Sequence, residues 1–160
     1  MSGARALFLA DPEATDRVGQ ALSEALRWGD ALCLSGGLGA GKSALARAFI
    51  QARLAAEGRR EETPSPTYTL VQSYALADGE IWHADLYRLG DAEEAEELGL
   101  FEAPERRILL LEWWNRLGEA APSRRLEAAL AVSGAGRALR LTAVGDGWEQ
   151  ALEAAERAAR

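Results

Sequence analysis

Apolar residues in the first third of the chain follow two patterns, short continuous runs and helical spacing. Ala6–Leu9 and Ala31–Ser35 are apolar runs of strand length, and glycines flank the second, as is typical of a buried parallel strand. Asp11 precedes Pro12 in the arrangement of a helix start, and the apolar residues after it recur at helical spacing. A second helix is predicted from about Lys42. The pattern therefore predicts the order strand, helix, strand, helix.

The rest of the chain is predicted to contain five strands and two helices. Charged residues and then prolines mark 58–66 as an exposed loop. Turn residues at 77–79 and 133–136 join two pairs of strands, which predicts two hairpins. The predicted strands are Tyr68–Leu76, Glu80–Leu89, Arg107–Glu112, Leu126–Val132 and Ala138–Ala143, and the predicted helices are Asp91–Leu98 and a closing helix from about Trp148.

The element order β-α-β-α-β-β-α-β-β-β-α is typical of an α/β domain. We expect a mixed sheet with a mostly parallel centre, extended by the hairpins and covered by helices on both faces. The chain has 160 residues, 48% hydrophobic and 27% charged, which is a globular balance. No linker long enough to divide it is present, so residues 1–160 are expected to form a single domain.

The net charge and the scarcity of cysteine and histidine argue against several classes of function. The net charge of −7 argues against self-sufficient binding of DNA or RNA, which needs a basic footprint. One cysteine, Cys33, and one histidine, His83, exclude an intramolecular disulfide and a multi-histidine zinc site. The first eleven residues contain too short an apolar stretch for a signal peptide or a membrane span. We therefore expect a cytoplasmic protein without a membrane partner.

A phosphate-binding pattern lies between the second predicted strand and the second predicted helix. The pattern G-x-x-x-x-G-K-[ST] is matched in full by Gly36, Gly37, Leu38, Gly39, Ala40, Gly41, Lys42 and Ser43. Glycines allow successive N–H groups to point at phosphate oxygens, and the helix start adds unpaired donors. Lys42, the only lysine of the chain, supplies a charge to the β- and γ-phosphates, and Ser43 completes magnesium coordination. The pattern predicts a nucleoside triphosphate site in a P-loop NTPase-like fold.

Two acids are candidates for the chemistry at this site. Glu112 follows four consecutive aliphatic residues, the form of a strand that delivers an acid to magnesium, although many buried strands also end in a solvated charge. On the strand before it, alternation places His83, Asp85 and Tyr87 on one face. Asp85 is suited to orienting a water or binding metal, or to a structural pair with Arg88 or another nearby arginine. His83 is interpreted as a packed or hydrogen-bonded residue rather than a base.

The segment 63–67 connects the second helix to the next strand, where P-loop proteins place a switch. Its prolines limit its freedom, and its three hydroxyl groups have the reach to contact the γ-phosphate or magnesium. A plain rigid connection is the competing interpretation.

Taken together, these motifs resemble the TsaE (YjeE) family, the bacterial ATPases of tRNA threonylcarbamoyl-adenosine synthesis. The resemblance extends from about residue 6 to residue 143 and rests on motifs in family order: GGLGAGKS (36–43), SPTYTL (65–70), HADLYRL (83–89), EELGL (96–100) and LLEW (110–113). It implies ATP and ADP as ligands, Mg²⁺ as cofactor, and a complex with the TsaD and TsaB proteins. The tRNA would then be held mainly through those partners, and the isolated chain would hydrolyse ATP slowly.

The resemblance also implies roles for individual residues. Lys42 would contact phosphate, Ser43 would contact magnesium, and Glu112 would be the second magnesium ligand. Asp85 would be the acid of hydrolysis, and Ser65 and Thr67 would be the switch residues. Trp113 would be the aromatic residue beside the nucleotide, and Arg137 would contact the nucleotide near its adenosine. Lys42 and Thr67 join Asp85 as catalytic candidates. The sequence departs from the family pattern at Gly37, where aspartate is usual, at Ser43, where threonine is more frequent, and at Trp114, where proline is common.

Three other functions would also use a phosphate-binding loop. A regulatory GTPase needs an N/T-K-x-D motif, which a chain with Lys42 as its only lysine does not contain. A small-molecule kinase of the nucleoside type is the stronger alternative, because Asp85 and Arg88 resemble the Asp-Arg pair of such enzymes. Such kinases usually have an arginine-rich lid. The closest candidates in this chain are Arg106 and Arg107, and they lead directly into a strand, which argues against a kinase. A binding module with an inactive site would not need the predicted acids.

Overall fold

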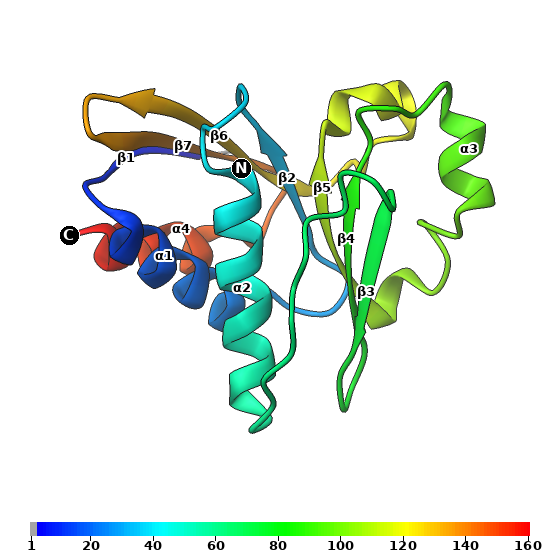
Figure 1. The fold of residues 1–160 in the computed structure, drawn as a ribbon, viewed down its shortest axis with the longest axis horizontal. Coiled ribbons are helices and arrows are strands. Elements are labelled where there is room, and N and C mark those ends of the chain that lie inside the picture. Colours follow the sequence, from blue (N-terminus) through cyan, green and yellow to red (C-terminus); the bar gives the residue numbers. More distant parts are fainter. Residues whose placement is uncertain (1–2) are drawn as a thin grey trace.

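The computed structural model of the protein describes residues 3–160, which form one seven-stranded sheet with helices around it (Figure 1). The predicted order of strands and α-helices is confirmed, with two short 3₁₀ helices in addition. The strands are β1 (Ala4–Leu9), β2 (Ala31–Ser35), β3 (Val71–Ala75), β4 (Glu80–Asp85), β5 (Arg107–Glu112), β6 (Arg125–Ser133) and β7 (Gly136–Val144). The helices are α1 (Pro12–Ala25), α2 (Lys42–Ala56), α3 (Ala92–Glu97), α4 (Glu149–Ala159), η1 (Pro104–Arg106) and η2 (Trp114–Ala120).

The sheet has a parallel centre and antiparallel margins. Its strand order is β1-β7-β6-β2-β5-β4-β3, and the four strands β6, β2, β5 and β4 pair in parallel. Strands β1, β7 and β3 pair antiparallel, and the two predicted hairpins are formed by β3 with β4 and by β6 with β7. The mixed sheet is thus confirmed. Because β2, β4 and β5 point the same way, their carboxyl ends meet at one edge, where α/β sheets commonly bind ligands.

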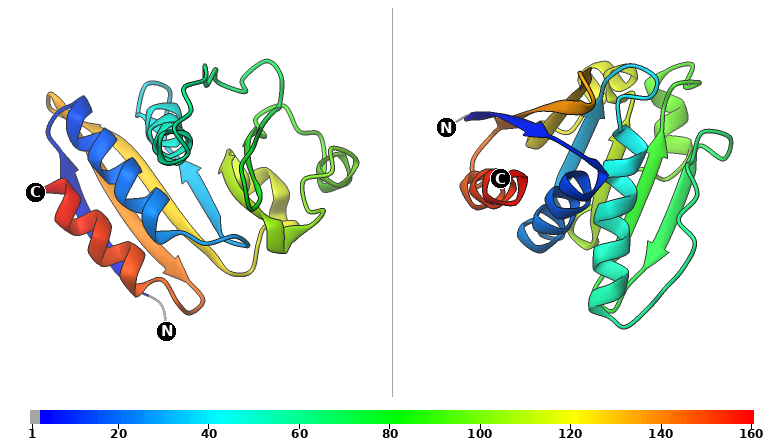
Figure 2. Two further views of the ribbon diagram at one scale, coloured as in Figure 1. Left: turned by 90° about the horizontal axis from the view of Figure 1, so that it is seen from below. Right: turned by 60° about the vertical axis from the view of Figure 1, so that its left-hand side comes forward.

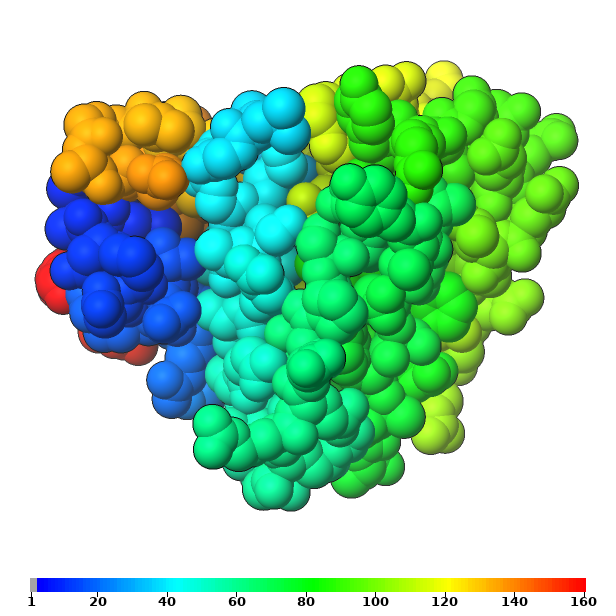
Figure 3. Space-filling model, viewed as in Figure 1, coloured from blue at the N-terminus to red at the C-terminus, as the bar shows by residue number. Residues whose placement is uncertain are grey.

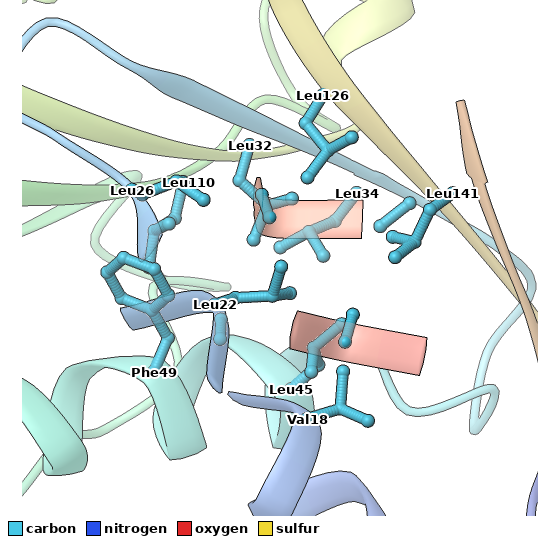
Figure 4. Close-up of a cluster of buried hydrophobic side chains, with 14 of the residues drawn as sticks. Val18, Leu22, Leu26, Leu32, Leu34, Leu45, Phe49, Leu110, Leu126 and Leu141 are labelled. Carbon is cyan, nitrogen blue, oxygen red and sulfur yellow. The ribbon is translucent and has the colours of Figure 1, made fainter. Parts of the chain in front are cut away.

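Helices α1, α2 and α4 cover one face of the sheet, and α1 and α4 run side by side (Figure 2). Asp11 caps α1 as predicted, since its Oδ1 accepts the Ala14 N–H at 2.8 Å. The core between helices and sheet includes ten apolar residues drawn in Figure 4: Val18, Leu22, Leu26, Leu32, Leu34, Leu45, Phe49, Leu110, Leu126 and Leu141. Burial of these side chains fixes the start of α2 against the ends of β2 and β5.

On the opposite face, α3, η2 and the loops beside them cover β2, β4 and β5. Cys33 and Leu111 point to this side, opposite to Leu34 and Leu110, as alternation along a strand requires. They pack with residues such as Leu100 and Leu117. The expected placement of helices on both faces is therefore confirmed. Within residues 3–160, no helix combines the length and the apolarity that crossing a membrane requires.

The first hairpin is shorter than the sequence predicts, and the predicted strands Tyr68–Leu76 and Glu80–Leu89 are both wrong at one end. Residues 67–70 form a turn closed by Leu70 N–H donating to Pro66 O at 2.8 Å, and Leu70 has a left-handed φ of 70°. At the other strand, Asp85 Oδ1 accepts the Tyr87 N–H at 3.0 Å, which turns the chain away from the sheet. Tyr87 is consequently exposed and does not share the strand face of Asp85.

Candidate functional site

The glycine-rich loop, residues 36–41, runs from the end of β2 directly into the start of α2. At two positions of the loop the backbone conformation favours glycine over residues with a side chain. A Cβ on Gly36 would lie 2.4 Å from Leu130 O, and Gly36 has a φ of 144°. Gly41, the residue that precedes α2, has a φ of 106°. This compact turn presents the free N–H groups of the first turn of α2 to the carboxyl edge of the sheet.

Lys42 is held at the inside of this loop. Its side chain is largely buried, and its Nζ donates to Gly36 O at 2.5 Å and to Gly37 O at 3.3 Å. The same ammonium group lies 5.0 Å from the ring centroid of Trp113, a cation–π contact. The single lysine of the chain is thus fixed at the carboxyl edge of the sheet.

Ser43 meets Glu112 although 69 residues separate them. Ser43 Oγ lies 3.3 Å from Glu112 Oε2 and 3.4 Å from Oε1. Glu112 is the last residue of β5 and is buried, and His83 Nε2 lies 2.6 Å from its Oε2. Asp85, also buried, is the register partner of Glu112 on β4. The fold therefore brings a hydroxyl group and two carboxyl groups together beside the loop.

These oxygen atoms are of the kind that magnesium prefers as ligands. Mg²⁺ typically binds one or two carboxylates together with substrate phosphates and waters, and seldom a cage made wholly of side chains. In the described part of the chain, no three His, Cys, Asp or Glu side chains are grouped so as to hold a metal ion. Ser43 and Glu112 offer an incomplete oxygen set, which phosphate oxygens and water would complete.

A cavity of about 740 Å³ lies over these groups. In Figure 3 a hollow separates the surface of the loop and α2, in cyan, from the green surface of the segment that follows it. Four cationic side chains and two carboxyl groups line the cavity, although the chain as a whole is acidic: Lys42, Arg47, Arg88, Arg137, Asp85 and Glu112. Such a surplus of positive charge favours an anionic ligand.

Most of the residues predicted for the site line this one cavity: Gly37, Leu38, Gly39, Ala40, Gly41, Lys42, Ser43, Thr67, Asp85, Glu112, Trp113 and Arg137. Gly36 and Ser65 are not part of its lining. Gly36 instead accepts from Lys42, and Ser65 Oγ lies 2.8 Å from Thr67 Oγ1. A larger hollow, of about 990 Å³, lies between the C-terminal ends of α1 and α2 and contains none of the predicted site residues.

Trp113 and Trp114 lie in different surroundings. Trp113 has a left-handed φ of 58°, and its ring centroid is 4.9 Å from that of Tyr87. The backbone turn at Trp113 leads into η2, whose first residue is Trp114. The guanidinium carbon of Arg125, at the start of β6, lies 4.7 Å from the centroid of the Trp114 ring. Trp113 lines the cavity, whereas Trp114 does not.

Several residues near the site had no site role in the sequence-based prediction. Tyr68, Tyr87, Arg47 and Arg88 line the cavity, and His83 is buried with its Nε2 2.6 Å from Glu112 Oε2. Arg88, which the sequence offered as a partner for Asp85, donates to Thr67 O at 2.6 Å. The alternation that placed His83 and Asp85 on one strand face was the available signal for His83.

Comparisons with known proteins agree with one another. The family model for "Threonylcarbamoyl adenosine biosynthesis protein TsaE" matches residues 9–139. A Bacillus subtilis protein named tRNA threonylcarbamoyladenosine biosynthesis protein TsaE is 32% identical over 145 residues, 89% of this chain and 88% of that protein. The protein of the same name from Rickettsia felis is 37% identical over 107 residues, 67% of this chain and 61% of that protein. This match therefore spans less than two thirds of the Rickettsia relative.

A solved structure is similar over nearly the whole chain. The crystal structure of Bacillus subtilis YdiB superposes with a TM-score of 0.77 at 26% sequence identity, covering 98% of this chain and 97% of that one. The similarity therefore includes the carboxyl edge of the sheet and the antiparallel margins.

Proposed function

This chain belongs to the TsaE family of threonylcarbamoyl adenosine biosynthesis proteins, and on that premise we propose that it binds and hydrolyses ATP with Mg²⁺ to support tRNA threonylcarbamoyl-adenosine formation. A role in that biosynthesis follows from the family. ATP hydrolysis, the nucleotide and the partners are the proposed part. The observation that carries the proposal is the meeting of Ser43 and Glu112 at 3.3 Å beside Lys42.

Lys42 and the backbone of the glycine-rich loop would bind the phosphates. The ammonium group already lies inside the loop, and the N–H groups at the start of α2 add donors that favour an anion. Arg47, Arg88 and Arg137 add positive charge around the cavity. Together they favour a ligand with several negative charges over a monophosphate.

Ser43 and Glu112 would hold magnesium, whose charge offsets the negative charge that develops on the phosphate oxygens. Asp85 is buried at the same edge and lines the cavity, so its carboxylate is suited to orienting an attacking water. Thr67 is exposed on the facing turn, and its hydroxyl group would contact the γ-phosphate from that side.

The contacts of three arginines do not favour the kinase alternative. Arg88 is bound to the backbone of Thr67 and is not paired with Asp85. Arg107 is buried in β5, where it donates to Gly99 O, and Arg106 ends η1. Neither of the two is placed in a lid over the cavity.

TsaD and TsaB are the proposed partners, with the tRNA held through them. The net charge of −7 supports this division, since the chain has no surplus of basic residues for a tRNA. The test is a reconstitution with TsaD, TsaB, tRNA and threonylcarbamoyl donor, in which modified adenosine is counted per TsaD molecule. We expect repeated turnover with ATP and this chain, and no repeated turnover with Glu112→Gln. Equal yields with and without the chain would refute the proposal.

A further inference from the structure

We propose that His83 is a positioning residue: its Nε2–H donates to Glu112 Oε2 and fixes the carboxylate that faces Ser43. The consequence of this bond for magnesium binding rests on the proposed function. The hydrogen bond itself rests on the geometry alone, with 2.6 Å between His83 Nε2 and Glu112 Oε2.

The sheet register places the two residues for this contact. His83 pairs with Leu110 on β5, and Glu112 lies two residues further along that strand. Residues two apart on a strand point to the same side, so His83 and Glu112 are diagonal neighbours on one face. Both side chains are buried, His83 fully, which leaves the imidazole little freedom to turn away from the carboxylate.

The surroundings of the imidazole decide where its proton lies. His83 Nδ1 is buried and has no hydrogen-bond partner among the described residues. A proton at Nδ1 would thus have no acceptor, whereas a proton at Nε2 has the Glu112 carboxylate as its acceptor. The structure therefore favours the Nε2–H tautomer.

Glu112 has few other groups to orient it. A buried carboxylate needs hydrogen-bond donors, and the Ser43 hydroxyl reaches it only at 3.3 and 3.4 Å. The bond from His83 is much shorter and engages only Oε2. In metal sites, loss of a partner that orients a ligand commonly costs 10–100-fold in metal affinity. His83 fits that role toward Glu112.

The bond can be tested in the nucleotide-free protein by NMR of the ¹⁵N-labelled imidazole. Because His83 is the only histidine, its two ring nitrogens give unambiguous signals. We expect the proton on Nε2, and a clear shift of the Nε2 signal in Glu112→Gln. A ring with its proton on Nδ1 and none on Nε2, or an Nε2 signal unaffected by Glu112→Gln, would overturn the proposal. This measurement needs neither ATP hydrolysis nor a variant of His83 that folds.

The consequence is tested by magnesium titrations of ATP affinity in His83→Leu and His83→Gln. Leucine removes the donor, whereas the glutamine amide keeps an N–H near the place of Nε2. We expect His83→Leu to need roughly 10–100-fold more magnesium, His83→Gln to stay near wild type, and magnesium-free nucleotide affinity to be unchanged in both. Equal magnesium requirements in the two folded variants would overturn the positioning role. A wild type without magnesium-dependent ATP binding would refute the proposed function, while the imidazole signals would still decide whether His83 holds Glu112.

Discussion

Asp85 and Glu112 are register partners on adjacent parallel strands, so two buried carboxyl groups stand side by side where β4 and β5 end. Their contacts differ. Glu112 faces the hydroxyl group of Ser43 and the imidazole of His83, whereas Asp85 accepts the backbone N–H of Tyr87 and lines the cavity. This difference in partners is the reason why we propose different roles for them, Glu112 as a magnesium ligand and Asp85 as the acid of hydrolysis.

Replacing Asp85 by asparagine should separate hydrolysis from binding. Asparagine keeps an oxygen for the Tyr87 N–H but removes the negative charge. We expect ATP turnover to fall by about 10²-fold or more, with magnesium–ATP affinity within about threefold of wild type, by phosphate release and calorimetry.

Asp91→Asn is a matched control for that substitution. Asp91 also accepts a backbone N–H through its side chain, at the start of α3, and does not line the cavity. Wild-type turnover in Asp85→Asn, or an equal loss in Asp91→Asn, would contradict the role of Asp85.

Fluorescence should distinguish the two adjacent tryptophans. Trp113 lies 5.0 Å from the Lys42 ammonium and lines the cavity, whereas Trp114 packs under Arg125 outside it. Nucleotide binding should therefore change the emission of wild type and Trp114→Phe, and most of the change should vanish in Trp113→Phe. If the change persists in Trp113→Phe, the indole does not lie beside the nucleotide.

Alanine in place of Gly36 should destabilise the fold, whereas alanine in place of Gly37 should not. A Cβ at Gly36 would approach Leu130 O to 2.4 Å, while a Cβ at Gly37 meets nothing within 4 Å. We expect Gly36→Ala to lower the free energy of unfolding by about 2 kcal/mol or more. Gly37→Ala should change it by less than about 0.5 kcal/mol. Urea unfolding measures both, and equal stabilities would show that the loop relaxes around Gly36.

Cys33 should make stability fall in alkaline solution. Burial in β2 raises the pKa of the Cys33 thiol from its ordinary value near 9.0 to about 12, while Arg125 opposes and Glu127 reinforces the rise. Between these values the folded thiol keeps its proton and the unfolded one loses it, so unfolding releases a proton. The free energy of unfolding should therefore fall by about 1.4 kcal/mol per pH unit from this group.

Cys33→Ala is the control for this effect, because it removes the thiol and leaves the other titrating groups in place. Urea unfolding under reducing conditions should show the stability difference between wild type and Cys33→Ala becoming less favourable to wild type as pH rises above 9. A difference that stays constant with pH would mean that the thiolate is tolerated in the folded core.

Periodicity and local motifs were sufficient for the parts of the fold that depend on neighbouring residues. Ala31–Ser35 and Arg107–Glu112 have the predicted bounds, and α2 starts at Lys42 as its glycine-rich entry predicts. The ends of β3 and β4 depend on hydrogen bonds within turns, from Leu70 to Pro66 and from Tyr87 to Asp85, which compete with strand pairing. The alternation of apolar and polar residues does not reveal this competition.

Many of the residues that line the candidate site were predictable from the sequence, but the contacts among them were not. The phosphate-loop pattern and the apolar strand before Glu112 identified two sequence-distant halves, and the sheet brings them together at Ser43. The contact of His83 with Glu112 depends on strand register, which a single sequence does not specify. The left-handed backbone at Trp113 likewise has no signal in the sequence pattern.

The measurement that tests the central claim most directly is phosphate release from ATP, with magnesium, by wild type, Lys42→Ala and Glu112→Gln. Glu153→Gln on the exposed side of α4 is the matched control for a lost carboxylate. We predict slow hydrolysis by wild type and Glu153→Gln, none above background by Lys42→Ala, and hydrolysis by Glu112→Gln only at strongly raised magnesium. Absence of hydrolysis by wild type, alone and with TsaD and TsaB, or full activity of Lys42→Ala, would contradict the account.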